Sequence, residues 1–363
     1  MHIPDGYLGP ATCAALYAGA SPFWYVALRR VRRSVHTRLV PLISLLAAFS
    51  FVVMMFNIPL PGGTTGHAVG VGLSASVVGP WASVLAISMA LVIQAIFFGD
   101  GGVTALGANC FNMAVVGSLV AWAVYRLISG GASLSSPRRA VAAGAAGYVA
   151  VNAAAFVTAL EFGAQPLLYR DASGAPLYCP YAWDVAIPAM MLGHLLVAGI
   201  AEFAFSAGVV GFLQRTDPGM LKDAAGLRPA GVLEVQTRSR TLRPLWLALG
   251  LMMLLTPIGI LASGTAWGEW AASDFADPAA RQQIAAASLG HAPPAGAPHG
   301  LAKLSTIWTA PWAGYAPTFL QSPEIGYVLS AMFGVGLVVL LALTVGGLVR
   351  VRRHQAAMKA VDA

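Results

Sequence analysis

Long apolar stretches dominate this chain and limit what it can fold into. They run at about 11–28, 38–57, 67–79, 81–98, 103–128, 139–160, 184–213, 245–262 and 325–349. Most approach or exceed the ~20 residues that a helix needs to cross the hydrocarbon core of a bilayer. Only 10% of the 363 residues are charged and 58% are hydrophobic, whereas about 25% are charged in a typical soluble domain. The composition excludes a soluble globule and predicts an all-α polytopic integral membrane protein.

The basic residues predict how the chain is oriented in the membrane, because Lys and Arg collect in cytoplasmic loops. With nine crossings and the N-terminus outside, all but three of the 21 basic residues fall inside, the exceptions being Arg170, Arg281 and Lys303. The third segment, 67–79, is short and Gly-rich, but omitting it would reverse every later loop. We therefore expect a multi-pass protein of the cell (inner, cytoplasmic) membrane with a cytoplasmic C-terminus. Topology explains the pI near 9.6, and no nucleic-acid partner is implied.

Two long polar loops divide the chain. Residues 1–215 are expected to form a seven-span, seven-helix bundle, and residues 216–244 a cytoplasmic linker. Residues 245–363 are expected to form a two-helix hairpin whose extracytoplasmic loop, 263–324, carries a short helix at 278–288.

The first residues, Met1-His2-Ile3-Pro4-Asp5-Gly6, carry a possible chelating group. They lack the charged start of a cleaved signal peptide, and Met before a large residue such as His is usually retained. The Met1 α-amine, the His2 backbone nitrogen and the His2 imidazole then close two adjacent chelate rings on one ion. A planar set of nitrogens favours Ni(II) or Cu(II) over the tetrahedral Zn(II). The alternative is an ordinary chain start followed by a histidine without a metal role.

A fourth nitrogen is available on the same side of the membrane. His67 follows the outside loop between the second and third spans, although a histidine there is often only interfacial. Asp5 lies in the turn that would hold the chelating end, Asp100 lies in the next outside turn, and Asn109 follows that turn. Asp100 is expected to accept a hydrogen bond from a ligand imidazole or from the N-terminal loop. The alternative for these three polar residues is a structural turn or cap.

Three motifs carry a resemblance to a known family: HIPDGYL at 2–8, PLPGGTTGHAVG at 59–70 and QAIFFGDGGVTALGANCFNMAVVG at 94–117. They resemble the CbiM/NikM family, the substrate-binding components of nickel and cobalt energy-coupling factor (ECF) transporters. The resemblance implies metal ligands at the Met1 amine, the His2 nitrogen and imidazole, and the His67 imidazole. It also implies a transmembrane coupling (T) subunit and ATP-binding ATPase subunits as partners. Residues 245–349 resemble the two-span CbiN/NikN companion, fused here to the C-terminus.

Several other polar residues receive secondary roles. His194 and Glu202 lie eight residues apart in one span, roughly 80° apart on a helix, and are interpreted as structural or partner-coupling groups. His291 and His299, in the outside loop, are interpreted as solvated residues, the alternative being that they pass metal to the site.

The expected function is high-affinity capture of Ni(II) or Co(II) outside and its ATP-driven uptake, for nickel enzymes or cobalamin biosynthesis. The ion is cargo, and no catalytic cofactor is expected. The sequence has no GxxxxGK[ST], HExxH or GxSxG motif, so we expect a non-enzyme without its own ATPase site. The main rival is an autonomous secondary metal transporter, which would need several intramembrane carboxylates. Only Glu202 lies convincingly within an expected span. Two weaker alternatives are a metal sensor without transport and a membrane enzyme that has a structural metal.

Overall fold

The computed structural model describes residues 1–34, 39–221 and 242–361, so most of the expected linker at 216–244 lies outside the described residues. The elements are α1 (Pro10–Ser34), α2 (Leu39–Met54), β1 (Ile58–Leu60), β2 (Thr64–Gly66), α3 (Val71–Ile93), α4 (Leu106–Asn109), α5 (Gly117–Ser129), α6 (Pro137–Leu168), α7 (Trp183–Gly193), α8 (Gly199–Thr216), α9 (Arg243–Leu255), α10 (Pro278–Ala287), α11 (His299–Leu304) and α12 (Pro323–Val361). Three π-helical turns extend or join them, η1 (Gln94–Phe98), η2 (Cys110–Val116) and η3 (His194–Ala198).

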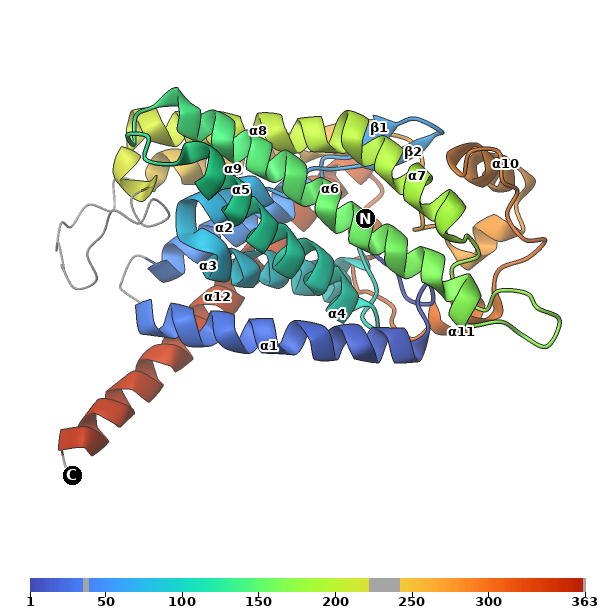
Figure 1. Cartoon of the computed structure of the whole chain (residues 1–363), viewed down its shortest axis with the longest axis horizontal. Coiled ribbons are helices and arrows are strands. Elements are labelled where there is room, and N and C mark those ends of the chain that lie inside the picture. The colour runs from blue at the N-terminus through green and yellow to red at the C-terminus, as the bar shows by residue number, and fades with distance from the viewer. Residues whose placement is uncertain (35–38, 222–241, 362–363) are drawn as a thin grey trace.

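The long helices lie side by side along the long axis of the molecule (Figure 1). α6 packs against α5, α7 and α8, because its Ala- and Gly-rich sequence lets other backbones come close. A side chain at Gly144 or Gly147 would collide with Phe203 or Glu202 of α8. Small residues at helix contacts are a common device of membrane bundles, where close packing replaces the hydrophobic effect.

Six helices among the described residues are long and apolar enough to cross a bilayer: Val71–Phe98, Leu106–Ser129, Pro137–Leu168, Trp183–Thr216, Arg243–Leu261 and Pro323–Gly347. α2 is a shorter apolar helix. The chain is therefore an all-α multi-pass membrane protein, as expected. The number of crossings and the outside position of the N-terminus stay predictions.

The third and fourth expected spans differ from the prediction. They belong to one stretch, Val71–Phe98, which is broken at Gly79 by a backbone conformation (φ 77°, ψ 175°) outside the helical range. The helix also begins at Val71 rather than at residue 67. Residues 67–70 are not helical, and they connect the β1–β2 hairpin to α3. The glycines and prolines around His67 thus form a hairpin and a non-helical segment instead of a short helix.

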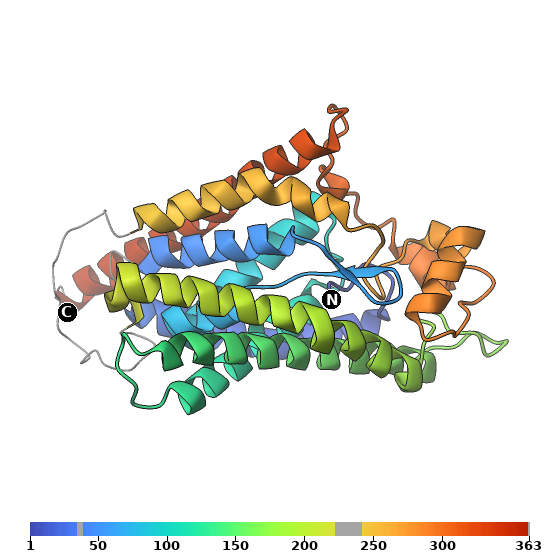
Figure 2. The same ribbon diagram turned by 90° about the horizontal axis from the view of Figure 1, so that it is seen from above.

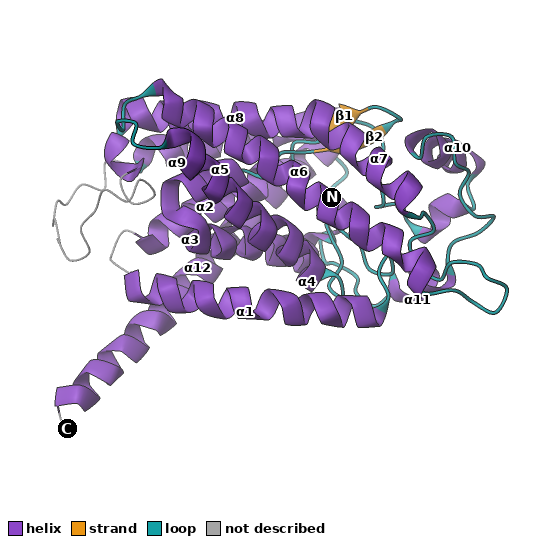
Figure 3. Ribbon diagram, viewed as in Figure 1, coloured by secondary structure: helices purple, strands orange, loops and turns teal. Residues whose placement is uncertain are grey.

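The chain after residue 241, called here the C-terminal part (242–361), packs against α2. α9 and α12 lie beside α2 (Figure 2). The Phe51 ring of α2 packs directly on Gly334 of α12, because any side chain at this position would collide with the ring. The loop between the two helices carries α10 and α11, which confirms the helix expected at 278–288. This loop lies at the same end of the bundle as the β1–β2 hairpin (Figure 3).

Candidate metal centre

The N-terminal segment is anchored on the loop before α4. The Asn109 side chain forms two hydrogen bonds with the backbone of Ile3: its Oδ1 accepts from the Ile3 N–H at 2.7 Å, and its Nδ2 donates to the Ile3 carbonyl at 3.0 Å. The Gly102 N–H donates to the same carbonyl at 2.8 Å. Among the described residues, no hydrogen bond uses the His2 backbone nitrogen. The segment is held through Ile3 and leaves the His2 nitrogen free.

Asp5 fastens the next turn of the same segment. Its carboxylate accepts from the Val103 N–H at 3.1 Å and the Thr104 N–H at 2.7 Å, and it also accepts from the Thr104 hydroxyl. Gly102 allows this approach, because a Cβ there would lie 2.4 Å from the Asp5 nitrogen. The structure therefore brings Asp5 and Asn109 to the chain start as anchoring residues.

Gly102→Ala is expected to weaken Ni(II) binding about tenfold, because the added methyl group pushes the Asp5 turn and the two residues before the Ile3 anchor out of place. Overpacking of this kind destabilises the folded chain by roughly 1–3 kcal/mol; a tenfold loss of affinity corresponds to about 1.4 kcal/mol spent on bringing the displaced donors back to the ion. Isothermal titration calorimetry on the purified protein measures the change. Gly131→Ala is the matched control, because a Cβ at Gly131 meets nothing within 4 Å. Equal affinity of the two variants would contradict the anchoring role.

The two sequence-predicted imidazoles lie next to each other. The rings of His2 and His67 stack with their centroids 5.0 Å apart and an angle of 27° between planes, and the residues are only 1% and 6% exposed. His2 Nδ1 lies 2.7 Å from Asp100 Oδ1, so Asp100 contacts a ligand-candidate imidazole as expected. His2 Nε2 is buried without a partner. Chelation of an ion through Nδ1 requires this nitrogen to leave Asp100.

His67 is in the form that binds a metal. Its Nδ1 lies 3.1 Å from the Ala68 carbonyl oxygen, which can only accept, so the proton sits on Nδ1 and Nε2 carries the free lone pair. Burial, and then the electrostatic interaction with His2 and with the chain start, lower the pKa of His67 to about 3. The imidazole is therefore neutral at neutral pH, as a ligand must be.

Asp100 stays a carboxylate in spite of its burial. Burial alone would raise its pKa, but the facing His2 and His67 imidazoles and the Tyr315 hydroxyl outweigh it and lower the pKa below its ordinary value. A negative charge is thus held beside both imidazoles.

Glu202 holds the segment that follows His67. Its buried carboxylate accepts from the Val69, Gly70 and Gly72 N–H groups at 2.7, 2.8 and 3.1 Å, and from Ser206 Oγ at 3.0 Å. These N–H groups surround the beginning of α3, where the helix dipole favours a negative charge. Glu202 thus holds the backbone that follows His67 in place. Its role in coupling to partner subunits stays a prediction.

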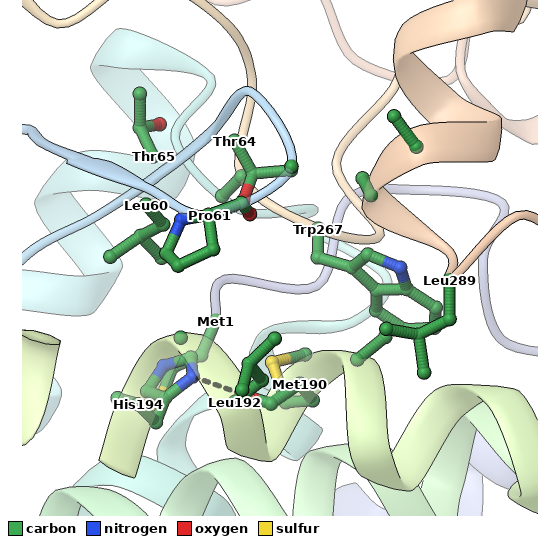
Figure 4. Close-up of a pocket in the computed structure, with 16 residues that line it drawn as sticks. Met1, Leu60, Pro61, Thr64, Thr65, Met190, Leu192, His194, Trp267 and Leu289 are labelled. Carbon is green, nitrogen blue, oxygen red and sulfur yellow. Dashed lines mark hydrogen bonds between the residues drawn. The ribbon is translucent and has the colours of Figure 1, made fainter. Parts of the chain in front are cut away.

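His194 is not part of the stack that the His2 and His67 rings form. Its Nδ1 is 2.8 Å from the Met190 carbonyl oxygen, and with Met1, Leu60 and Trp267 it lines a cavity of about 50 Å³ (Figure 4). His291 and His299 are exposed, and His291 Nδ1 lies 3.0 Å from the Ser288 carbonyl oxygen. Neither contacts the centre formed by His2 and His67.

Two residues of the C-terminal part reach the centre and were not predicted from the sequence. Glu269 Oε1 forms an ion pair with the Met1 amine at 3.1 Å. The Tyr315 hydroxyl donates to Asp100 Oδ2 at 2.5 Å and accepts from Gln94 Nε2 at 3.1 Å. Glu269 stands between two tryptophans in WGEW and Tyr315 in APWAGYAPTF. These aromatic clusters in the loop between α9 and α12 were the available signal.

A second carboxylate within a long apolar helix was also not predicted. Glu161 lies inside α6, where its Oε2 accepts from Asn112 Nδ2 at 2.7 Å. Glu161 and Glu202 thus both lie in helices long and apolar enough to cross a bilayer, and the expectation that only Glu202 lies at membrane depth stays a prediction. Among the described residues, no group of three or more His, Cys, Asp or Glu side chains is arranged to hold a metal ion. The predicted donor set contains two such side chains, the others being the chain start and a backbone nitrogen.

Two known protein families match this chain, one in the part before residue 221 and one in the part after residue 242. The family described as "Cobalt uptake substrate-specific transmembrane region", CbiM, matches residues 2–220. The chain belongs to the CbiM family. A "PDGLE domain" matches residues 243–351. This pairing agrees with the predicted combination of a CbiM/NikM-type part and a CbiN/NikN-like part.

Full-length relatives share this pairing. The "Fused nickel transport protein NikMN" of Rhodobacter capsulatus is 56% identical over 339 residues, which are 93% of this chain and 95% of the relative. The "Probable fused nickel transport protein LarMN" of Lactiplantibacillus plantarum is 42% identical over 344 residues, 94% and 96% of the two chains. A solved structure described as "Crystal Structure of an transition metal transporter" is 47% identical, with a TM-score of 0.57 over 63% of this chain and 100% of that one. The CbiM-type fold thus has relatives that are named for metal transport.

Proposed function

We propose that this protein captures Ni(II) or Co(II) at the outer face of the membrane and is the substrate-specific component of an ATP-driven transporter. The observation that carries the proposal is the meeting of the Met1 amine, the free His2 backbone nitrogen and the stacked His2 and His67 imidazoles at one end of a membrane bundle. The relatives named for nickel and cobalt transport support the same cargo.

The donor set favours nickel. The Met1 amine, the His2 backbone nitrogen, His2 Nδ1 and His67 Nε2 are four nitrogens, and Ni(II) accepts a square-planar nitrogen set. The relative with the highest identity given above is named for nickel and matches this chain over both of its parts. We place Ni(II) first, with Co(II) as the second cargo.

Capture releases the contacts that hold the donors in this conformation. The amine and His2 Nδ1 face Glu269 and Asp100, and the ion replaces both contacts with metal–nitrogen bonds. Metal binding releases protons because amine and backbone nitrogens must be deprotonated to donate. Asp5, Asn109 and Glu202 do not bind the ion; they keep the two donor segments in register.

Transport requires other chains in this proposal, because the sequence has no phosphate-binding GxxxxGK[ST] loop. A coupling (T) subunit and ATPase subunits supply the energy, and the bilayer surrounds the bundle.

The test is uptake of radioactive nickel by cells that produce this chain with or without a T subunit and ATPase subunits. We expect accumulation only with the partners, and stronger competition by unlabelled Ni(II) than by Co(II). Equal uptake without partners would favour an autonomous secondary transporter. Absence of Ni(II) and Co(II) binding by the purified chain would exclude the proposal.

A further inference from the structure

An open cavity of about 230 Å³ lies between the two parts of the chain and touches the candidate centre. We call it the intermodule cavity. His67, Asp100 and Thr65 line it from one side, and Glu269, Tyr315 and Tyr327 of the C-terminal part line it from the other. Six waters occupy about 180 Å³ in the liquid, so the cavity has room for a divalent ion with its hydration shell.

The cavity carries two carboxylates from different parts of the chain. Asp100 and Glu269 both line it, and of the described residues around it none is Lys or Arg. A cleft lined by charges of one sign concentrates ions of the opposite sign and raises their association rate. Oxygen donors and hydroxyls, such as Tyr315 and Thr65, suit an ion that still holds its waters.

Each carboxylate also covers one of the chelating nitrogens. Glu269 Oε1 lies 3.1 Å from the Met1 amine, and Asp100 Oδ1 lies 2.7 Å from His2 Nδ1. Met1 and His2 themselves do not line the cavity. An ion that comes through the cavity therefore meets the carboxylates and His67 before it reaches the chelating end.

We propose that the intermodule cavity is the route by which a hydrated divalent cation reaches the centre, and that Glu269 is a transient ligand on this route. Glu269 holds the arriving ion next to the Met1 amine while its waters are exchanged for nitrogens. The C-terminal part thereby speeds metal loading without contributing a ligand to the bound ion. This inference rests on the proposed function of the same centre.

The test is the rate of Ni(II) loading into the purified full chain, followed by stopped flow with a colour indicator for free metal. Glu269→Gln is expected to slow association about tenfold, the lower end of electrostatic effects of this kind. Release, measured by adding a chelator, should stay within about twofold. Raising the salt concentration should slow loading of the unaltered chain more than that of the variant, because salt screens the missing charge.

Two further variants separate charge from structure. Glu269→Asp keeps the charge and should retain most of the loading rate. Glu324→Gln removes the same charge from the first turn of α12, where Glu324 is exposed, bonds to Ser322 and does not line the cavity, and should load normally.

Loading of Glu269→Gln at the rate of Glu324→Gln would overturn the inference. A change confined to the release rate would overturn it too, because Glu269 would then hold the bound ion. Both results leave the proposed function intact, which fails only if the unaltered chain binds neither Ni(II) nor Co(II).

Discussion

Adding a single residue before Met1 is expected to abolish high-affinity Ni(II) binding although His2 and His67 are both retained. The extension turns the Met1 amine into an amide, which has no lone pair for the metal and cannot close the first chelate ring. It also places extra atoms beside Glu269, next to the buried Met1 side chain. Calorimetry on the purified extended protein measures the loss, and acetylation of the Met1 amine should have the same effect.

The control adds the same residue after Ala363, at the other end of the chain. It should leave the affinity unchanged. An N-terminally extended protein that still binds Ni(II) as tightly as the control would remove the Met1 amine from the set of ligands, and the centre would have to be built from His2 and His67 alone.

His67→Ala is expected to weaken Ni(II) binding roughly 100-fold or more while the protein is still produced in normal amounts. Loss of a residue that only orients a ligand costs about 10–100-fold in metal affinity, and His67 supplies a donor itself. Folding should be spared, because Glu202 holds the following segment through Val69, Gly70 and Gly72 and not through the imidazole.

His299→Ala is the matched control for this substitution, because His299 is an exposed histidine of the loop between α9 and α12. It should bind Ni(II) like the unaltered chain. Unchanged affinity of His67→Ala, together with the same melting temperature as the control, would reassign His67 as a packing residue that merely stacks on His2.

The local parts of the centre could be predicted from the sequence, and the distant contacts could not. The chelate at Met1 and His2 follows from covalent spacing, and Asp100 and Asn109 were singled out because polar groups near an apolar span need a partner. The pairing of Glu269 with Met1 depends on how the loop between α9 and α12 folds back over the bundle. No periodicity or motif in that loop predicts which nitrogen its carboxylate meets.

The helices, too, could be predicted where they depend on local sequence and not where they depend on distant contacts. Their apolar lengths predicted most of them, including α6 and α12. The segment around His67 was predicted as a short helix, but Pro59, Pro61 and the neighbouring glycines favour a hairpin, and Glu202 satisfies the N–H groups that follow it. A hydropathy pattern does not show that a carboxylate on another helix accepts hydrogen bonds from the backbone of this segment. The non-helical segment could therefore not be distinguished from a membrane span.

The ion pair between Met1 and Glu269 also sets a time at which the centre can be completed. A ribosome adds about 5–20 residues per second, so Glu269, 268 residues after Met1, is made roughly 13–54 s later. During that interval the first residue to emerge has neither its acidic partner nor the wall of the cavity beside it. The ion pair therefore forms only in chains whose synthesis has passed the loop between α9 and α12, and a chain truncated before Glu269 would have its amine without this partner.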